Sequence, residues 1–186
     1  MIRFDSTPLV SAYVVSTELL GDSRGIFTRL HCETEFEAQR IMPRMVQTNL
    51  SRTPIRGTIR GLHFQAAPSR EGKLVRCMRG RIHDVIVDLR PNSSSYLRHF
   101  SIELDDNDLR GVYVPPGFAH GFQTLTADVT VLYQMTDFHR AALSRGIRWN
   151  DPTFGVTWPL EDAFLNDRDA SYPDFVPSVV AGFEEY

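Results

Sequence analysis

Short runs of alternating apolar and polar residues, separated by Gly, Pro, Asn and Asp, recur along the chain. Such runs predict strands, because the side chains of a strand point alternately to its two faces. The runs lie at residues 12–16, 26–30, 45–51, 58–65, 73–77, 82–89, 96–104, 111–114, 119–122 and 129–136. The intervals between them are the length of a hairpin turn, so neighbouring strands are expected to run antiparallel.

Helical signals are sparse. Residues 33–40 carry Thr34 as a candidate N-cap with Glu37 three residues later, and Pro43 would end such a helix. A terminal helical turn is expected at residues 181–186. Many short strands with little helix predict an all-β protein, an antiparallel jelly-roll barrel with short peripheral helices.

The length of 186 residues fits a single domain, residues 1–186, with one sizeable core. Beyond about residue 137 the alternation loosens into an irregular C-terminal segment. Trp149 and Trp158 are expected to anchor this segment against the barrel.

Composition narrows the range of partners. A formal net charge of -3 gives no support for nucleic acid or an anionic membrane as a partner. The apolar runs are too short to span a bilayer and the first residues lack a signal-peptide pattern, so a cytoplasmic protein is expected. Cys32 and Cys77 form no metal-binding or redox motif, and we expect two reduced thiols.

Ionisable side chains gather between residues 57 and 90. A regular strand at residues 58–65 would place Arg60 on one face and His63 with Gln65 on the other. Lys73 follows on the next strand. Two permanent cations and one titratable base within core-forming strands are costly unless water or an anionic ligand compensates them. A binding pocket is therefore expected here.

A metal site is the first alternative for these side chains. His63, Gln65, Glu71 and His120 can be grouped as a ligand set. A metal-binding barrel of this kind normally offers His-x-His followed by Glu, whereas Gln65 stands at the second His position and Lys73 lies beside Glu71. We expect no metal and no cofactor, and a metal-dependent barrel remains an alternative.

Ordered motifs along most of the chain are more specific than its composition. They are GDSRGIF at residues 21–27, VQTNLS at 46–51, RGLHFQ at 60–65, KLVR at 73–76, DVIVDLR at 84–90, PGFAHGF at 116–122, WNDP at 149–152 and RD at 168–169. In this order they resemble the dTDP-4-dehydrorhamnose 3,5-epimerases, the cupin-fold enzymes of nucleotide-sugar biosynthesis. The resemblance implies a cupin barrel and a homodimer that needs no metal or cofactor.

The resemblance also implies a role for each matched residue. His63 would be the general base, paired with Asp169, and Tyr133 the general acid. Lys73 would contact the enolate. The implied substrate contacts are Arg24, Gln47, Asn49, Arg60 and His120, with Phe138 and His139 near the aromatic that stacks on thymine and Arg168 beside the paired Asp.

The implied reaction is epimerisation of a nucleotide-linked 4-keto-6-deoxyhexose, with dTDP as the expected nucleotide, at C3 and C5. Removing a proton beside a ketone leaves an enolate that needs a cation, and inversion needs a base and an acid on opposite faces of the sugar. Arg29 and Arg145 depart from the family pattern, which leaves open another nucleotide or inversion at C3 or C5 alone. A non-catalytic sugar-binding barrel is the remaining alternative.

Overall fold

The protein is described from a computed structural model that covers residues 1–41 and 44–183. Its strands are β1 (Ile2–Ser6), β2 (Tyr13–Thr17), β3 (Leu20–Asp22), β4 (Gly25–Phe27), β5 (Gln47–Thr53), β6 (Ile59–Gln65), β7 (Lys73–Arg79), β8 (Arg81–Asp88), β9 (His99–Asp105), β10 (Gly111–Val114), β11 (Phe118–Thr124), β12 (Val129–Met135) and β13 (Ser144–Gly146). Short helical segments are α1 (Glu33–Ala38), η1 (Ala141–Leu143), α2 (Asp167–Ala170) and η2 (Pro177–Val180). The predicted all-β fold with short peripheral helices is confirmed.

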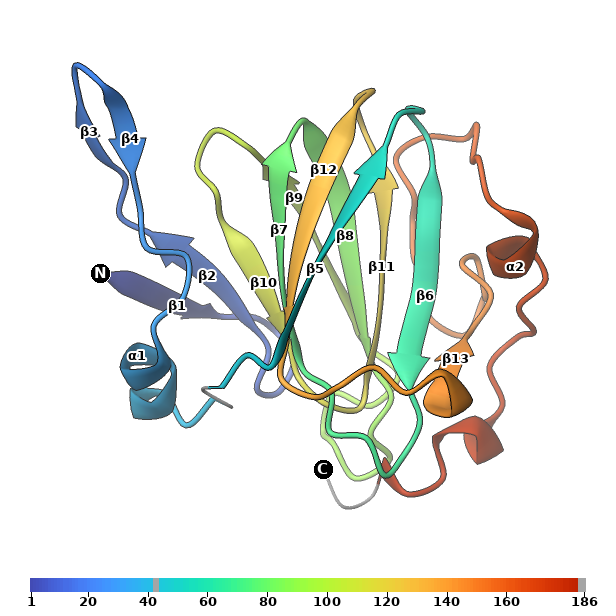
Figure 1. The fold of residues 1–186 in the computed structure, drawn as a ribbon. Coiled ribbons are helices and arrows are strands. Elements are labelled where there is room, and N and C mark those ends of the chain that lie inside the picture. The colour runs from blue at the N-terminus through green and yellow to red at the C-terminus, as the bar shows by residue number, and fades with distance from the viewer. Residues whose placement is uncertain (42–43, 184–186) are drawn as a thin grey trace.

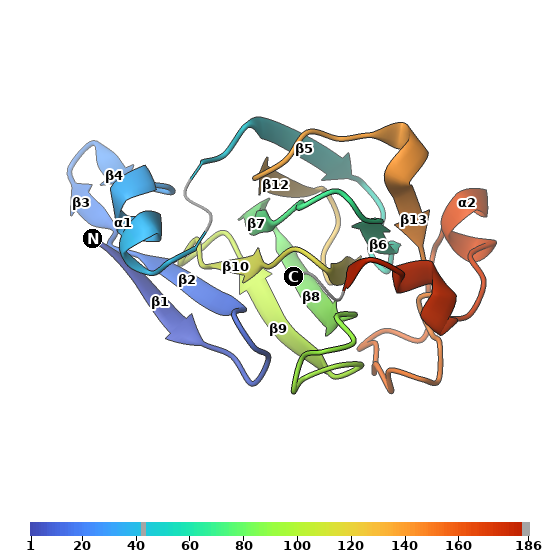
Figure 2. The ribbon, with the colours of Figure 1, turned by 90° about the horizontal axis from the view of Figure 1, so that it is seen from below.

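The strands form two facing antiparallel sheets (Figure 1). One sheet has the order β1-β2-β10-β7-β12-β5 and the other β13-β6-β11-β8-β9, while β3 and β4 pair as a separate hairpin. Viewed from below, β1, β2 and α1 lie at one side of the barrel and β13 with α2 at the other (Figure 2). No helix in the described part of the chain is long and apolar enough to cross a membrane.

The inner faces of the two sheets build the main apolar core. Val75 of β7 and Val131 of β12 pack there with Phe122 of β11 and other aliphatic side chains. Because side chains alternate along a strand, the residues two positions away share these inner faces. Lys73 precedes Val75, His120 precedes Phe122 and Tyr133 follows Val131 in this way, so the strand period itself brings polar groups into the barrel.

One β-bulge overturns the alternation predicted for residues 58–65. In the pairing of β6 with β11, His63 lies opposite His120 but Arg60 lies opposite Phe122, so β6 contains one extra residue. A bulge shifts the facing of every residue beyond it. Arg60 therefore faces the barrel interior, as His63 does, and its Nε donates to Thr53 Oγ1 of the opposite sheet at 3.1 Å. The prediction that Arg60 and His63 lie on different faces was wrong.

Two glycines allow β6 and β11 to approach each other closely at this bulge. A Cβ added at Gly121 would lie 2.8 Å from the backbone oxygen of Arg60, and one at Gly61 would lie 2.5 Å from Cα of Gly121. Both are closer than real Cβ contacts come, and the neighbouring atoms are backbone that cannot move aside. The shape of the strand under the site thus depends on the absence of side chains here.

Gly121→Ala is expected to lower the free energy of unfolding by about 1–3 kcal/mol, because the added methyl overpacks a rigid contact. Urea unfolding measures this loss in the free energy of unfolding. Gly21→Ala is the matched control, since its Cβ would meet nothing closer than 3.8 Å. Equal stability of the two variants would contradict the close approach of β6 and β11.

The C-terminal segment packs on the outer face of the five-stranded sheet. Leu62 and Phe64 of β6 contribute to a second apolar cluster with Ile147, Phe154 and Phe183 of the segment. The predicted aromatic anchors lie together: Trp158 Nε1 donates to the carbonyl oxygen of Trp149 at 3.0 Å. Asp151 of the WNDP motif accepts backbone N–H groups of Thr153 and Phe175, which fixes the course of the segment.

The early helix differs from its prediction. It begins at Glu33, after Cys32 as N-cap, and no side chain caps it, so the predicted capping box of Thr34 and Glu37 does not form. The helix ends at Ala38. Pro43 and the last three residues of the predicted helical turn at 181–186 lie outside the described residues.

Candidate active site

A His–Asp pair lies at the mouth of the barrel. His63 Nε2 is 2.8 Å from Asp169 Oδ1, and the other carboxylate oxygen accepts the backbone N–H of Gly61 at 3.2 Å. Burial alone would raise the pKa of Asp169, but the hydrogen bonds from His63 and Gly61 outweigh it and lower the pKa below its ordinary value. The carboxylate is therefore charged at neutral pH. In the tautomer that donates Nε2–H to this carboxylate, Nδ1 of the imidazole is the acceptor.

Exposure differs sharply within the pair. The Asp169 side chain is 3% exposed and that of His63 37%. The short helix α2 places Asp169 beside β6, although the two segments are far apart in the sequence. Asn166 caps this helix by accepting a hydrogen bond from the backbone N–H of Asp169 at 2.7 Å. Asp169 thus fixes one side of the imidazole, and the other side is open to a ligand.

Tyr172 supports the imidazole and was not anticipated from the sequence. Its ring lies edge-on to His63 with the centroids 5.8 Å apart. It occupies the space beside Gly146, where an added Cβ would overlap the ring. Arg168 lies over the same ring, 5.7 Å from its centroid, and donates to Ser144 Oγ.

A second His–Asp pair is buried inside the barrel. His120 Nε2 is 2.8 Å from Asp84 Oδ2, with both side chains at most 5% exposed. The register places His120 directly opposite His63. Asp84 had little to single it out in the sequence, since a carboxylate inside an apolar strand is usually a satisfied structural group. Pairing with His120 becomes visible only once β8 and β11 are neighbours.

Tyr133 faces the same interior from the opposite sheet. Its ring lies 6.2 Å from that of His120, and its hydroxyl is 3.3 Å from Ser51 Oγ. Burial raises the pKa of Tyr133 to about 12, although the Ser51 hydrogen bond and the charge of Arg60 act in the other direction. The phenol consequently keeps its proton throughout the neutral range.

Lys73 lies with His63, His120 and Tyr133 in the barrel interior, and these four side chains form the site cluster. Its Nζ lies 3.3 Å from Glu71 Oε1 and 3.5 Å from the carbonyl oxygen of His63, and the ammonium is nearly buried. Glu71 and Gln65, grouped above as potential metal ligands, bond to each other at 2.7 Å. Among residues 1–41 and 44–183, no three His, Cys, Asp or Glu side chains gather as a metal site.

Amide and aromatic side chains lie at the edge of the cluster. Gln47 Nε2 donates to Asn49 Oδ1 at 3.1 Å, since residues two positions apart lie on one face of β5. Gln47 Oε1 also accepts the backbone N–H of His139 at 3.2 Å. Phe138 is 61% exposed beside them. The loop after β12 is thereby fastened to the edge strand β5.

Arg24 is the one predicted site residue that a single chain holds away from this cluster. It lies at the tip of the β3–β4 hairpin, paired with Asp22, and the hairpin projects away from the barrel (Figure 1). The two departures from the family pattern have local partners: Arg29 lies 3.5 Å from Glu35, and Arg145 donates to the carbonyl oxygens of Ala142 and Ser144.

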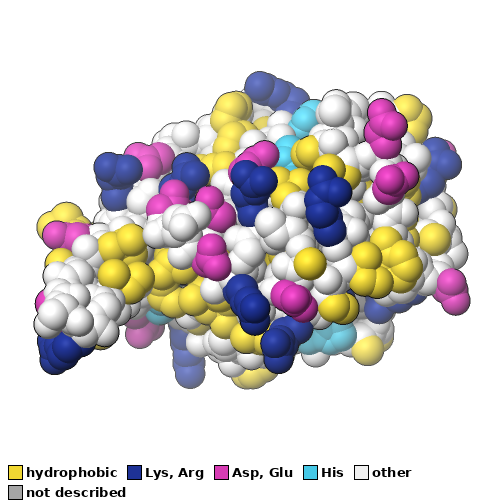
Figure 3. All heavy atoms as spheres, turned by 90° about the horizontal axis from the view of Figure 1, so that it is seen from above, with side chains coloured by type: hydrophobic (Ala, Val, Ile, Leu, Met, Phe, Trp, Pro, Cys, Tyr) yellow, Lys and Arg dark blue, Asp and Glu magenta, His cyan; other side chains and the backbone are white. Residues whose placement is uncertain are grey.

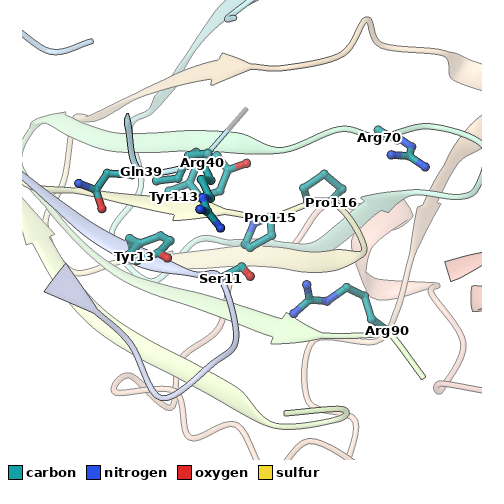
Figure 4. Close-up of a pocket in the computed structure, with 10 residues that line it drawn as sticks. Ser11, Tyr13, Gln39, Arg40, Arg70, Arg90, Tyr113, Pro115 and Pro116 are labelled. Carbon is teal, nitrogen blue, oxygen red and sulfur yellow. The ribbon is translucent and has the colours of Figure 1, made fainter. Parts of the chain in front are cut away.

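Two further surface features lie outside the cluster. A cavity of about 390 Å³, lined by Tyr13, Tyr113, Pro115 and three arginines among others, contains none of the predicted catalytic side chains (Figure 4). Seen from above, basic and acidic side chains are interspersed (Figure 3).

An antiparallel barrel that holds a His–Asp pair, a protonated Tyr and a nearly buried Lys has the groups of an enzyme that moves protons by general acid–base catalysis. The family model for dTDP-4-dehydrorhamnose 3,5-epimerase matches residues 6–176. The chain belongs to the dTDP-4-dehydrorhamnose 3,5-epimerase family.

Individual relatives agree over nearly the whole chain. The dTDP-4-dehydrorhamnose 3,5-epimerase of Sinorhizobium fredii is 39% identical over 171 residues, which cover 91% of this chain and 88% of the relative. The crystal structure of the Bacillus anthracis enzyme with TDP and PPi bound superposes with a TM-score of 0.91 at 35% identity, covering 94% of this chain and all of that one. A Legionella pneumophila epimerase in complex with dTDP-4-keto-L-rhamnose gives a TM-score of 0.88 at 31% identity, with 94% and 93% covered.

Proposed function

We propose that the protein epimerises a dTDP-linked 4-keto-6-deoxyhexose at C3 and C5 through an enolate. The observation that carries the proposal is the convergence of His63, Tyr133 and Lys73 from three strands on one barrel interior. The names of the relatives support dTDP as the nucleotide and both carbons as the centres inverted. Nucleotide-linked substrates also make the cytoplasm the expected location.

In this proposal His63 Nδ1 removes the proton from the carbon beside the ketone. Asp169 holds the imidazole in orientation and stabilises the imidazolium that forms. Tyr133, on the opposite sheet, returns a proton to the other face of the same carbon. Each general acid or base of this kind contributes roughly 10²–10⁴ in rate.

Negative charge then develops on the ketone oxygen, where Lys73 would donate. His120, whose Nε2 faces Asp84, would add a second donor through the Nδ1–H of its imidazolium form. Preorganised donors at a developing oxyanion are worth on the order of 10²–10³ each, because the site need not reorganise during the reaction. Both side chains are fixed by carboxylates, Glu71 and Asp84 respectively.

The remaining predicted residues are proposed to bind the nucleotide. Arg60 offers a fork of donors suited to the diphosphate. Gln47 and Asn49 offer amides to the base, and the exposed ring of Phe138 offers a stacking surface, with His139 and Arg168 at the margin of the site.

We also propose a homodimer in which Arg24 acts in the partner's site. The hairpin that carries Arg24 exposes Ile26 and Phe27, the latter at 72%, and it cannot reach the site of its own barrel as it stands. Apolar side chains on a projecting hairpin are typical of a surface that a partner covers. The partner's hairpin is proposed to pack on the edge strand β5, where Leu50 is exposed near Gln47 and Asn49.

Subunit mixing tests the dimer. Chains with Arg24→Ala and chains with His63→Asn should each be inactive as homodimers. Each heterodimer has one intact site of its two, and random mixing of equal amounts makes half of the dimers heterodimers, so the mixture should regain about a quarter of wild-type activity. The regained quarter comes from the site that combines His63 of one chain with Arg24 of the other. No recovery after complete exchange of subunits would show that Arg24 does not act across the dimer.

Solvent exchange tests the function itself. Incubation of the protein with dTDP-4-keto-6-deoxyglucose in D₂O should place deuterium at C3 and C5, which NMR locates. Label at a single carbon would identify a mono-epimerase, and saturable binding without label would identify a non-catalytic barrel. Loss of activity on thorough chelation, restored by metal, would favour the metal-dependent alternative.

A further inference from the structure

Gln65 is the central member of a hydrogen-bond chain that the proposed mechanism does not use. It lies on the inner face of β6, 6% exposed, next to His63. Its amide oxygen accepts the backbone N–H of Arg140 at 2.7 Å, and its amide nitrogen donates to Glu71 Oε2 at 2.7 Å. The same nitrogen is 3.3 Å from the carbonyl oxygen of Phe138 and from Ser69 Oγ. One buried side chain therefore fastens two separate loops.

The first of these loops carries Glu71, whose second oxygen pairs with the Lys73 ammonium. The two side chains are 6% and 10% exposed, so the ion pair is shielded from water. A buried ion pair depends on good geometry and on hydrogen bonds to its remaining atoms. Gln65 supplies such a bond to Glu71, and Glu71 in turn fixes the direction of Lys73.

The second loop joins β12 to β13 and carries Phe138 and His139. Gln65 holds its backbone from the barrel side, while Gln47 holds the backbone N–H of His139 from β5. These contacts set where the Phe138 ring stands relative to the amides of Gln47 and Asn49. Gln65 thus anchors the loop that would bind the base. Through Glu71, it also anchors the lysine that would bind the ketone oxygen.

We propose that Gln65 and Glu71 are positioning residues: Glu71 aims the Lys73 ammonium at the ketone oxygen, and Gln65 fixes both Glu71 and the Phe138–Arg140 segment. The inference rests on the proposed function and extends it to two residues that sequence reasoning had considered only as metal ligands. It requires that the two residues share an effect on the chemical step and differ in their effect on nucleotide binding. Glu71 governs the chemical step, and Gln65 governs both the chemical step and nucleotide binding.

Glu71→Gln is the first test, because it keeps the shape and the acceptor for Gln65 but removes the charge that holds Lys73. We expect kcat for deuterium exchange and for inversion to fall together by roughly 10- to 100-fold, since a small misplacement of a catalytic group has an effect of this order. The Kd for dTDP, measured by calorimetry, should stay within about twofold of wild type because the Phe138 loop is untouched. A kcat within threefold of wild type would overturn the role of Glu71.

Gln65→Met is the second test, since methionine is similar in length and makes none of the four contacts. Here kcat should fall as in Glu71→Gln, and dTDP should in addition bind about tenfold more weakly, the size expected when loop order must be restored on binding. Unchanged dTDP affinity would overturn the role of Gln65. Gln65→Asn, which keeps an amide but removes a methylene, should show the same pattern and replaces the Met variant if that one does not fold.

Gln123→Met is the matched control. Gln123 is a fully buried glutamine on the neighbouring strand β11 that also ties down a distant backbone, through both the N–H and the carbonyl oxygen of Leu160. It should lose stability yet keep kcat and dTDP affinity, which separates positioning from loss of structure. A wild-type protein that neither exchanges deuterium nor binds dTDP would instead refute the proposed function and leave these contacts without a catalytic meaning.

Discussion

His63→Asn is expected to lower both deuterium exchange and epimerisation by at least about 10³-fold, within the range by which a general base accelerates proton transfer. Asparagine can still donate an amide N–H to Asp169, so the buried carboxylate keeps a partner. It has no basic nitrogen to take the substrate proton. The measurement is label incorporation at C3 and C5 by NMR, together with product formation, at saturating substrate.

His99→Asn serves as the control for this prediction. His99 lies on β9, and its Nδ1 contacts the carbonyl oxygen of Phe154 in the outer cluster, away from the barrel interior. Its variant should keep wild-type exchange after correction for folded protein. If His63→Asn exchanges deuterium normally, another group is the base, and the role given to the His63–Asp169 pair is wrong.

Tyr133→Phe is expected to separate exchange from inversion. Removal of the hydroxyl leaves the ring in the apolar core, so His63 can still form the enolate and exchange should remain within a few-fold of wild type. Inversion should fall by about 10²-fold or more, because protonation from the opposite face loses its acid. The pKa of about 12 keeps the phenol of the wild-type protein in the donating form at neutral pH. Stopped time courses that follow both label and product stereochemistry measure the two rates.

Tyr96→Phe, in the turn before β9, is the control and should change neither rate. Equal losses of exchange and inversion in Tyr133→Phe would place the hydroxyl in enolate formation instead, for example as a donor to the ketone oxygen. Comparison of the exchange rate with the inversion rate therefore assigns Tyr133 either to protonation from the opposite face or to enolate formation.

The alternating pattern predicted the architecture well, because burial of one face of a strand requires an apolar residue at every second position. The same alternation puts Lys73 with Val75 on one face of β7 and Gln47 with Asn49 on one face of β5. The pattern missed β1, β3 and β13, and it drew β4 and β9 too long. Strand ends depend on where a partner strand stops, which a single run of residues does not contain.

The candidate site was only partly readable from local sequence. The roles given to His63, Lys73 and Tyr133 came from the resemblance to a family, and the structure brings all three side chains to one interior. Asp84 and Tyr172 went unnoticed as partners of the two histidines, because their own neighbours in sequence are ordinary. Glu71 and Gln65 were noticed but for another chemistry, since spacing shows which residues are close in the chain and not which atoms bond.

By itself the sequence determined the class of fold, the strands that carry chemistry and the family, since each depends on periodicity or on ordered short motifs. Only the tertiary structure decided which side chains meet. The bulge in β6 turned Arg60 inward, α2 brought Asp169 to His63 from over a hundred residues away, and Gln65 joined two loops. Such contacts are made between segments distant in the chain, where geometry set by packing, and not local residue preference, fixes the distance between two atoms.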